Sequence, residues 1–289
     1  MGLIADVGRG DWLLERAGGW ATAGGVAGTG FAAYARILHP LPAHRRDASV
    51  TDQWGVPLLV DGRPWRWSDI AERTGKRVHP LVQWVHLSGR TPPVAVETDD
   101  GWTVGPPEEG QLDTDLLAAL TVHLARTTTT PTDLVAAVWE GWGDLGAGSS
   151  AASFGFGEPT AADIAAQQQL ALVELRHRRR MVADALEGPR FAWPGRGFHL
   201  MTASLDTFAR PDWPDTVSLE DHPAPGHTPQ MLWPEDHAWV LATEIDWDAT
   251  IVAGSRTLVA DILGDPRFEA FEVDPDDDLS WAADTVNQG

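Results

Sequence analysis

The segment from residue 233 to residue 255 constrains the fold of this chain more than any other part of it. It reads WPEDHAWVLATEIDWDATIVAGS, and its apolar and polar residues alternate as they do in a pair of β-strands. Trp239 falls on an apolar strand face, so we predict that it packs in the core. Glu244, Asp246 and Asp248 follow at intervals of two, and an extended backbone puts all three on one face. That face meets either water or a positively charged partner.

Shorter signals elsewhere agree with an antiparallel sheet. Apolar residues at helical spacing predict a helix over 114–126, and Ser255 is expected to cap a helix over 257–263. Hairpins and helices do not alternate regularly, which indicates an α+β fold with a mainly antiparallel sheet built from hairpins and packed helices. The predicted hairpin turns are Asp61-Gly62, Asp100-Gly101 and Pro194-Gly195.

Residues 143–187 interrupt this pattern. The first part, 143–160, is rich in Gly and Ser without periodicity and is predicted to be an exposed linker. The second part, 161–187, has the spacing of one long helix. We therefore predict one α+β unit, in which residues 1–142 form the N-terminal part and residues 188–289 the acidic C-terminal part. The linker and long helix are an insertion between the two parts.

The charge of the chain is strongly negative and unevenly distributed. The formal net charge is −21, and the residues from Asp206 onward contain 19 acidic and 3 basic residues. Such a field repels nucleic acid and anionic membranes and attracts basic partners. The RHRRR run at 176–180 lacks interleaved aromatic residues, so we expect its arginines to face solvent or the protein's own carboxylates. Solubility, or life in a salty cytoplasm, is the alternative explanation of the charge.

Several classes of protein are excluded by composition. The chain has no cysteine, which rules out disulfides, thiolate catalysis and thiolate metal sites. No apolar run is long enough for a membrane helix, and the first residues lack the pattern of a signal peptide, so a cytoplasmic location is expected. The 20 arginines against a single lysine are typical of a GC-rich genome.

Motifs for cofactors and nucleophilic catalysis are absent. GGVAGTG at 24–30 has neither GxGxxG spacing nor a following GK[ST], so residues 18–30 are predicted to be a flexible connector without a cofactor. No GxSxG motif surrounds a serine. The acidic DPDDD run at 274–278 lacks the glycine and the terminal glutamate of an EF-hand.

The residues around the WPEDH motif could form either a metal site or a plain polar loop. Imidazoles and carboxylates are zinc ligands, but regular elements normally hold them at a fixed spacing. Here two of the histidines lie in a proline-rich loop without an HExxH frame, so we predict no metal. The residues concerned are His222, His227, Glu235, Asp236 and His237.

We predict a non-enzymatic, protein-binding function and keep two alternatives. The first is a non-enzymatic cytoplasmic binding protein, similar in kind to inhibitor or immunity proteins, whose acidic face contacts a basic partner protein. The second is an enzyme or small-ligand-binding protein, and the third is a structural module. A concave pocket favours the second and a flat charged face the first. The acidic face would consist of Glu244, Asp246 and Asp248, and the pocket of Arg36, His39, Trp233, His237 and Glu244.

Longer motifs carry a resemblance as well. GRGDWLLER, GFAAYARILHP, TTTTP with VWEGWG, and above all LWPEDHAWVLATEIDWDATIVAGS with ADTVN resemble a family of uncharacterised proteins of high-GC bacteria. The resemblance covers the chain except about residues 143–187. It implies that the N-terminal and C-terminal motifs belong to one unit, and it implies no catalytic residue.

Overall fold

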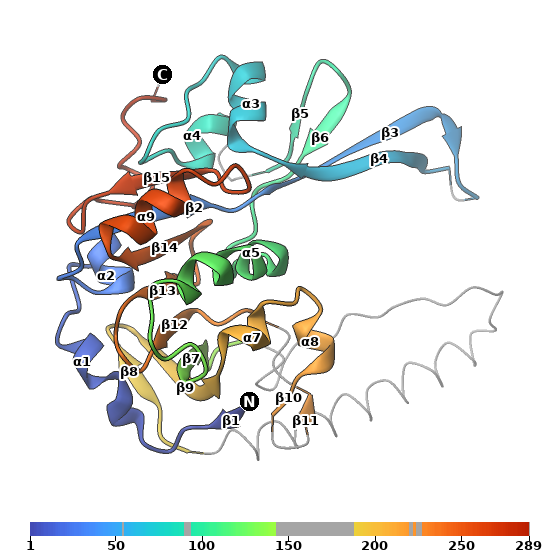
Figure 1. Ribbon diagram of the computed structural model, residues 1–289. Helices are drawn as coiled ribbons and strands as arrows, with labels where there is room; N and C mark the ends of the chain where they lie inside the picture. The colour runs from blue at the N-terminus through green and yellow to red at the C-terminus, as the bar shows by residue number, and fades with distance from the viewer. Residues whose placement is uncertain (54, 90–93, 143–187, 220–221, 224–226, 289) are drawn as a thin grey trace.

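The computed structural model describes residues 1–53, 55–89, 94–142, 188–219, 222–223 and 227–288 (Figure 1). The linker predicted at 143–160 and the helix predicted at 161–187 lie outside these described residues. Among the residues that are described, no helix is long and apolar enough to cross a membrane.

A nine-stranded antiparallel sheet forms the body of the protein (Figure 1). In order across the sheet, its strands are β1 (Gly2–Leu3), β9 (Arg196–Ala203), β7 (Leu134–Trp139), β12 (Met231–Pro234), β13 (Val240–Thr243), β14 (Ala249–Gly254), β2 (Ala33–Leu38) and β15 (Ala270–Val273), with β8 (Phe191–Trp193) also paired to β9. β2 lies between β14 and β15, and β7 lies between β9 and β12, so strands from either side of 143–187 interleave. All these pairs are antiparallel, which confirms the predicted α+β class.

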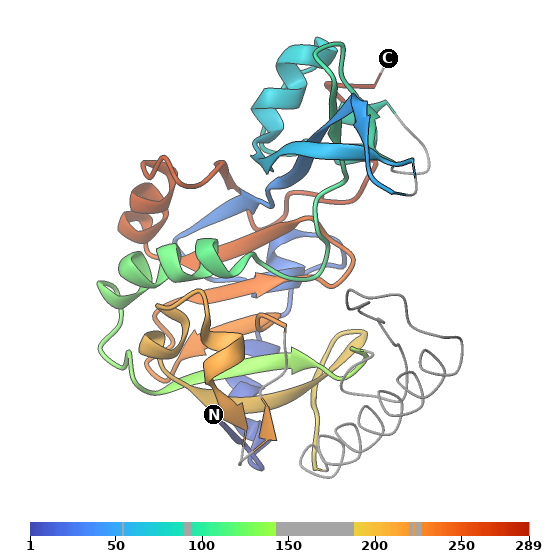
Figure 2. The same cartoon turned by 90° about the vertical axis from the view of Figure 1, so that its right-hand side faces the viewer.

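Both faces of this sheet are covered, because successive side chains of a strand point to opposite sides. In β7, Leu134, Ala136 and Val138 belong to one apolar core, whereas Val135 and Ala137 belong to another. We call the core that contains Leu134 the first core and the core that contains Val135 the second core. Figure 2 shows helices packed against the sheet on the side of the first core. The helices of the first core are α5 (Thr114–Ala125), α7 (Leu205–Phe208), α8 (Trp213–Thr216) and α9 (Arg256–Leu263); those of the second are η1 (Val7–Gly10), α1 (Asp11–Leu14) and α2 (Ala23–Ala27). Trp239 is fully buried in the first core, as predicted.

A second, four-stranded sheet follows β2 along the chain (Figure 1). Its strands, in order, are β4 (Pro57–Trp65), β3 (Leu41–Thr51), β6 (Trp102–Val104) and β5 (Val96–Glu97), accompanied by α3 (Trp67–Thr74) and α4 (Trp84–Ser88). Trp65, Trp67, Trp84 and Trp102 are buried together in a third core. The outer part of the β3–β4 hairpin projects away from the body. A separate pair, β10 (Ser218–Leu219) and β11 (His222–Pro223), completes the strands of the described residues.

Most local predictions are confirmed. Hairpin turns occur at Asp100-Gly101 and Pro194-Gly195, where both glycines adopt a positive φ, of 83° and 82°. The helix predicted over 114–126 is α5. Ser255 caps α9, since its Oγ accepts a hydrogen bond of 3.2 Å from the backbone nitrogen of Leu258.

The turn predicted at Asp61-Gly62 is wrong. These residues lie within the continuous strand β4, and the chain reverses earlier, between Asp52 and Val56. There the backbone nitrogen of Asp52 donates a 2.9 Å hydrogen bond to the carbonyl of Val56. The backbone nitrogen of Val56 donates one of 2.9 Å to the carboxylate of Asp52. The pairing partner of β4 is the long preceding strand β3, and this pairing outweighs the local turn signal.

The connector predicted at 18–30 is also wrong in part, because it contains the helix α2. Thr22 caps this helix by accepting a 3.0 Å hydrogen bond from the backbone nitrogen of Gly25. A Cβ at Gly18 would lie 2.6 Å from the backbone of Gly24. Glycine therefore serves close backbone packing here.

Candidate functional site

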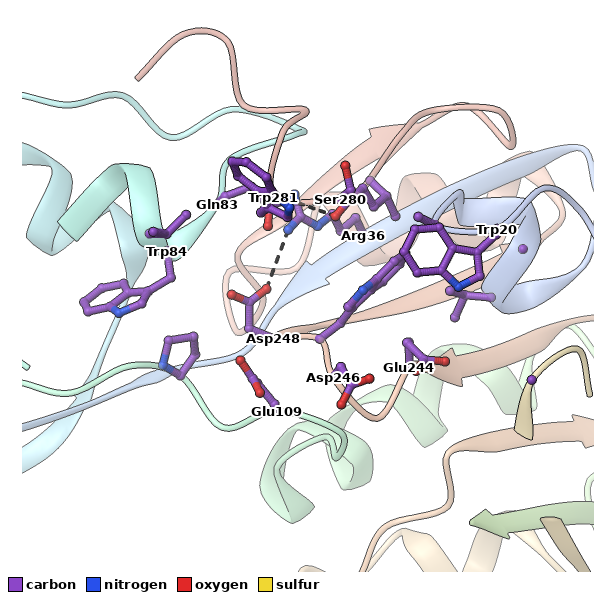
Figure 3. A pocket seen from close by; sticks show the side chains of 18 of the residues that line it. Trp20, Arg36, Gln83, Trp84, Glu109, Glu244, Asp246, Asp248, Ser280 and Trp281 are labelled. Atoms are coloured by element: carbon purple, nitrogen blue, oxygen red, sulfur yellow. Dashed lines mark hydrogen bonds and ion pairs between the residues drawn. The ribbon is translucent and has the colours of Figure 1, made fainter. Parts of the chain in front are cut away.

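A pocket of about 750 Å³ lies beside the loop between β13 and β14. The loop, residues 244–248, forms part of its wall (Figure 3). The other walls come from segments far apart in the sequence: Gly18, Trp20, Ala21, Gly25 and Val26; Arg36; residues 83–86; Pro106, Pro107 and Glu109; residues 193–196; and residues 279–281. The pocket therefore exists only in the folded chain.

The loop brings Glu244, Asp246 and Asp248 to the pocket in a way that differs from the prediction. An extended strand with three carboxylates on one face was expected, but β13 ends at Thr243 and β14 begins at Ala249. The residues between them form a turn, in which the backbone nitrogen of Trp247 donates a 3.0 Å hydrogen bond to the carbonyl of Glu244. The β13–β14 hairpin needs this reversal, because Thr243 pairs directly with Thr250.

Arg36 and Asp248 form a buried ion pair at one side of the pocket. Arg36, on β2, is 2 % exposed, and its Nη2 lies 3.7 Å from Oδ1 of Asp248, which is beyond hydrogen-bond distance. Nη1 donates a 2.8 Å hydrogen bond to the carbonyl of Pro80, whereas Nε has no partner among the described residues. Burial raises the pKa of Asp248 and lowers that of Arg36, and the attraction between the two opposes both shifts.

The other two carboxylates of the loop share one guanidinium. Nη2 of Arg196 lies 2.7 Å from Oε1 of Glu244 and 2.7 Å from Oδ2 of Asp246. Arg196 begins β9, directly after the β8–β9 turn, so the pairing links two hairpins. The side chain of Asp246 is 72 % exposed, and that of Glu244 is 22 % exposed.

Glu109 adds a fourth carboxylate to the pocket. It lies in the segment between β6 and α5 and is exposed. Its carboxylate forms no hydrogen bond or ion pair with any described residue. The nearby pocket wall removes part of the water around this exposed side chain, and this desolvation, together with the charges of Asp248 and Asp246, raises the pKa of Glu109. Figure 3 shows Glu109, Asp246 and Asp248 on one side of the pocket, across from Arg36 and Trp281.

Five tryptophans line the same pocket. Trp20 is 91 % exposed and Trp281 is 71 % exposed, and both are labelled in Figure 3. Trp84 and Trp193 are buried in its wall, and Trp247 is half-buried. Ala21, next to Trp20, has a φ of 61°, a left-handed conformation that costs about 1 kcal/mol or more for a residue other than glycine. Large exposed indoles beside a concave surface are characteristic of binding sites.

Of the seven predicted site residues, four line the pocket: Arg36, Glu244, Asp246 and Asp248. The other three, His39, Trp233 and His237, do not. Trp233 is fully buried in the second core, and His237 stacks on Trp12 with a centroid distance of 3.9 Å. The prediction failed for these two because they lie at the opposite end of β13 from the pocket.

His39 lies close to the pocket but has a structural role. Its ring is 1 % exposed, with Nδ1 2.7 Å from the carbonyl of Glu108 and Nε2 2.9 Å from Oγ1 of Thr250. Burial lowers the pKa of His39 to about 4, so the ring is neutral at pH 7. Nδ1 then donates to the carbonyl and Nε2 accepts from the hydroxyl of Thr250.

The residues weighed as metal ligands are dispersed. His227 stacks on Trp142 with a centroid distance of 4.0 Å, and Asp236 accepts hydrogen bonds from Thr128, Thr129 and Ala238. Only the backbone of His222 is described. Within the described part of the chain, no group of three or more His, Cys, Asp or Glu residues could hold a metal ion.

Among the pocket residues that sequence reasoning missed are Trp20, Glu109, Arg196 and Trp281. No motif connects them, and each lies in a loop or at a strand end. Their approach depends on the order of strands in the sheet, which local patterns do not encode. The high number of tryptophans, 15, was a signal, but it did not indicate which indoles are exposed.

Comparisons with protein-family models, curated proteins and solved structures found no match to this chain. The family resemblance of residues 232–255 thus stays a prediction. The function of the pocket has to be inferred from its own side chains.

Proposed function

We propose that this protein binds a small organic ligand in the pocket beside residues 244–248. The observation that carries the proposal is the convergence on one cavity of exposed Trp20 and Trp281 with the carboxylate of Glu109, which has no partner among the described residues. A volume of about 750 Å³ is in the range of small-molecule sites. Apolar walls with a few polar groups provide affinity and orientation, respectively.

A flat acidic face for a basic partner protein has less support. Glu244 and Asp246 already share Arg196, and Asp248 is largely buried beside Arg36. Three carboxylates in these positions do not present a continuous charged surface. Their concave arrangement favours a ligand that enters the pocket.

Ligand binding is measurable through the tryptophans. We would titrate the protein with one compound of each charge class, namely choline, cellobiose and citrate, and follow both tryptophan fluorescence and the melting temperature. We expect at least one class to raise the melting temperature, because a ligand that binds only the folded state stabilises it.

The variant Trp20→Ala/Trp281→Ala should lose this response and keep the melting temperature of the unliganded protein. Leu59→Ala, on the exposed strand β4, is the matched control and should respond as the wild type does. The proposal fails if none of the three classes binds, or if the double variant responds unchanged.

A further inference from the structure

We infer that the ligand is an organic cation, whose ammonium or guanidinium nitrogen lies between Glu109, Asp248 and the indole of Trp20 or Trp281. This inference rests on the proposed function of the pocket and names the chemical class of its ligand. Four independent features of the described residues lead to it.

The first feature is the charge of the pocket wall. Four carboxylates line it, those of Glu109, Glu244, Asp246 and Asp248, against the two guanidinium groups of Arg36 and Arg196. Arg196 is already hydrogen-bonded to two of the carboxylates. Negative charge is therefore in excess, and the net charge of −21 on the whole chain adds to it. Such a field concentrates cations at the pocket.

The second feature is that two of the carboxylates lack a close partner. Glu109 has none among the described residues, and Asp248, whose side chain is 15 % exposed, is 3.7 Å from the nearest guanidinium nitrogen. Desolvation and like charge raise the pKa of Glu109, which means that its surroundings in the protein disfavour the ionised form. A bound cation would remove this penalty.

The third feature is Arg36, a side chain 98 % buried at the pocket wall. A guanidinium carries five N–H donors, and this one donates a single hydrogen bond, to the carbonyl of Pro80, while its Nε has no partner in the described chain. Buried donors are normally satisfied by protein, water or ligand. A hydroxyl oxygen on the cationic ligand would supply an acceptor next to the nitrogen site.

The fourth feature is a precedent within the same molecule. The guanidinium of Arg73 lies 4.2 Å from the ring centroid of Trp65, and its Nη2 is 3.0 Å from Oδ2 of Asp100. An indole face and a carboxylate thus hold one cation between them. Trp20, Trp281 and Glu109 bring the same two kinds of group to the pocket, and Glu109 has no cationic partner among the described residues.

Other ligand classes fit these features less well. An anion would approach excess negative charge, and Arg36 alone does not reverse it. A neutral sugar would stack on the tryptophans but would also displace water from the carboxylate of Glu109. Desolvating this carboxylate without supplying a positive charge costs free energy.

The test compares choline with its uncharged isostere 3,3-dimethylbutan-1-ol by isothermal titration calorimetry on the full chain. The two have the same shape and hydroxyl group, so the difference measures the charge alone. We expect choline to bind about tenfold or more tightly than the isostere, and its affinity to fall as salt is raised. Glu109→Gln should weaken choline about tenfold at an unchanged melting temperature, because an exposed side chain adds little stability.

Glu108→Gln is the matched control. Glu108 is the neighbouring residue and has the same charge, but its side chain contacts Gln111 and does not line the pocket. We expect this variant to bind choline as the wild type does. Equal binding of choline and its isostere, or equal weakening by both variants, overturns the cation inference. Binding of cellobiose but not choline would also overturn it while leaving the proposed pocket intact, whereas no binding of any class rejects both.

Discussion

The two connections at the ends of β13 both contain carboxylates beside an aromatic or imidazole ring. They differ in how many of these carboxylates have a close partner within the protein. Before the strand, the turn at 235–237 contains two carboxylates and a histidine; after it, the loop at 244–248 contains three carboxylates and a tryptophan. In the turn, Asp236 accepts hydrogen bonds from Thr128, Thr129 and Ala238. Glu235 pairs with Arg9, and His237 stacks on Trp12.

In the loop, by contrast, Asp248 lacks a hydrogen bond from its partner Arg36, and the neighbouring Glu109 has no partner in the described chain. The difference shows that residue type alone does not indicate a binding site. A turn whose carboxylates all have hydrogen-bond partners within the protein stabilises the fold. A loop whose polar groups face a cavity retains capacity for a ligand.

The largest effect of a single substitution on the free energy of unfolding is expected at Arg36, the ion-pair partner of Asp248 in the loop. Arg36→Met should lower the free energy of unfolding by about 3–5 kcal/mol, because it leaves the buried carboxylate of Asp248 without its cation. Urea denaturation at pH 7 measures the change. The double variant Arg36→Met/Asp248→Asn should recover part of the loss, and a double variant no more stable than the single one would contradict the ion-pair explanation.

A pH effect is expected from two buried histidines, and the contribution of each one is at the lower end of that range. Burial lowers the pKa of His39 and of His199 to about 4, below the ordinary value of 6.5. The two histidines therefore bind protons below about pH 6.5 in the unfolded chain, but only below about pH 4 in the folded chain. Their contribution to the free energy of unfolding is fully present above about pH 6.5 and is lost as pH falls from 6.5 to 4. Each histidine should contribute about 3 kcal/mol of this loss.

Urea denaturation at several pH values across this window measures the loss. His39→Gln should give a shallower dependence on pH, since one of the two groups is removed. A wild-type stability that stays constant across the window would show that these rings are accessible to protons in the folded state.

A smaller effect is expected in the satisfied turn. Asp236→Ala should destabilise the protein by about 2 kcal/mol, because it removes charge-assisted hydrogen bonds from Thr128 and Thr129. Asp246→Ala, in the loop, is the matched control and should change stability by less than about 0.5 kcal/mol, since its side chain is 72 % exposed. Equal losses in both variants would remove the contrast between turn and loop.

The smallest effect is expected at Trp20. Trp20→Ala should change the free energy of unfolding by less than about 0.5 kcal/mol, because the side chain is 91 % exposed. Trp12→Ala should cost more, since this indole stacks on His237 and packs against Phe31. Thermal melts of the two variants compare them directly. A marked loss in Trp20→Ala would mean that this indole stabilises the fold instead of serving a ligand.

Features that depend on neighbouring residues were predictable from the sequence. The turns at Asp100-Gly101 and Pro194-Gly195, the helix α5 and the Ser255 cap of α9 each depend on a few consecutive residues. The α+β class followed from the same signals.

Features that depend on distant pairing were not predictable. Asp61-Gly62 became part of a strand because β3 pairs across it, and Glu244 to Asp248 became a turn because β13 and β14 pair in the register Thr243 to Thr250. The pocket is the extreme case, since Glu109, Arg196 and Trp281 meet only after the sheet has assembled.

The interleaved strand order also has a consequence for the kinetics of folding. β2 requires β14 and β15 as neighbours, and β1 pairs with β9 at a separation of 200 residues. This topology has a high contact order, which slows folding because long loops must close before the strands can pair. During synthesis, β2 (AYARIL), whose residues are all buried in the folded protein, lacks its second pairing strand until residue 273 has left the ribosome. The nascent chain is therefore exposed to aggregation for most of its translation, and its yield in cells should depend on chaperones that cover this strand.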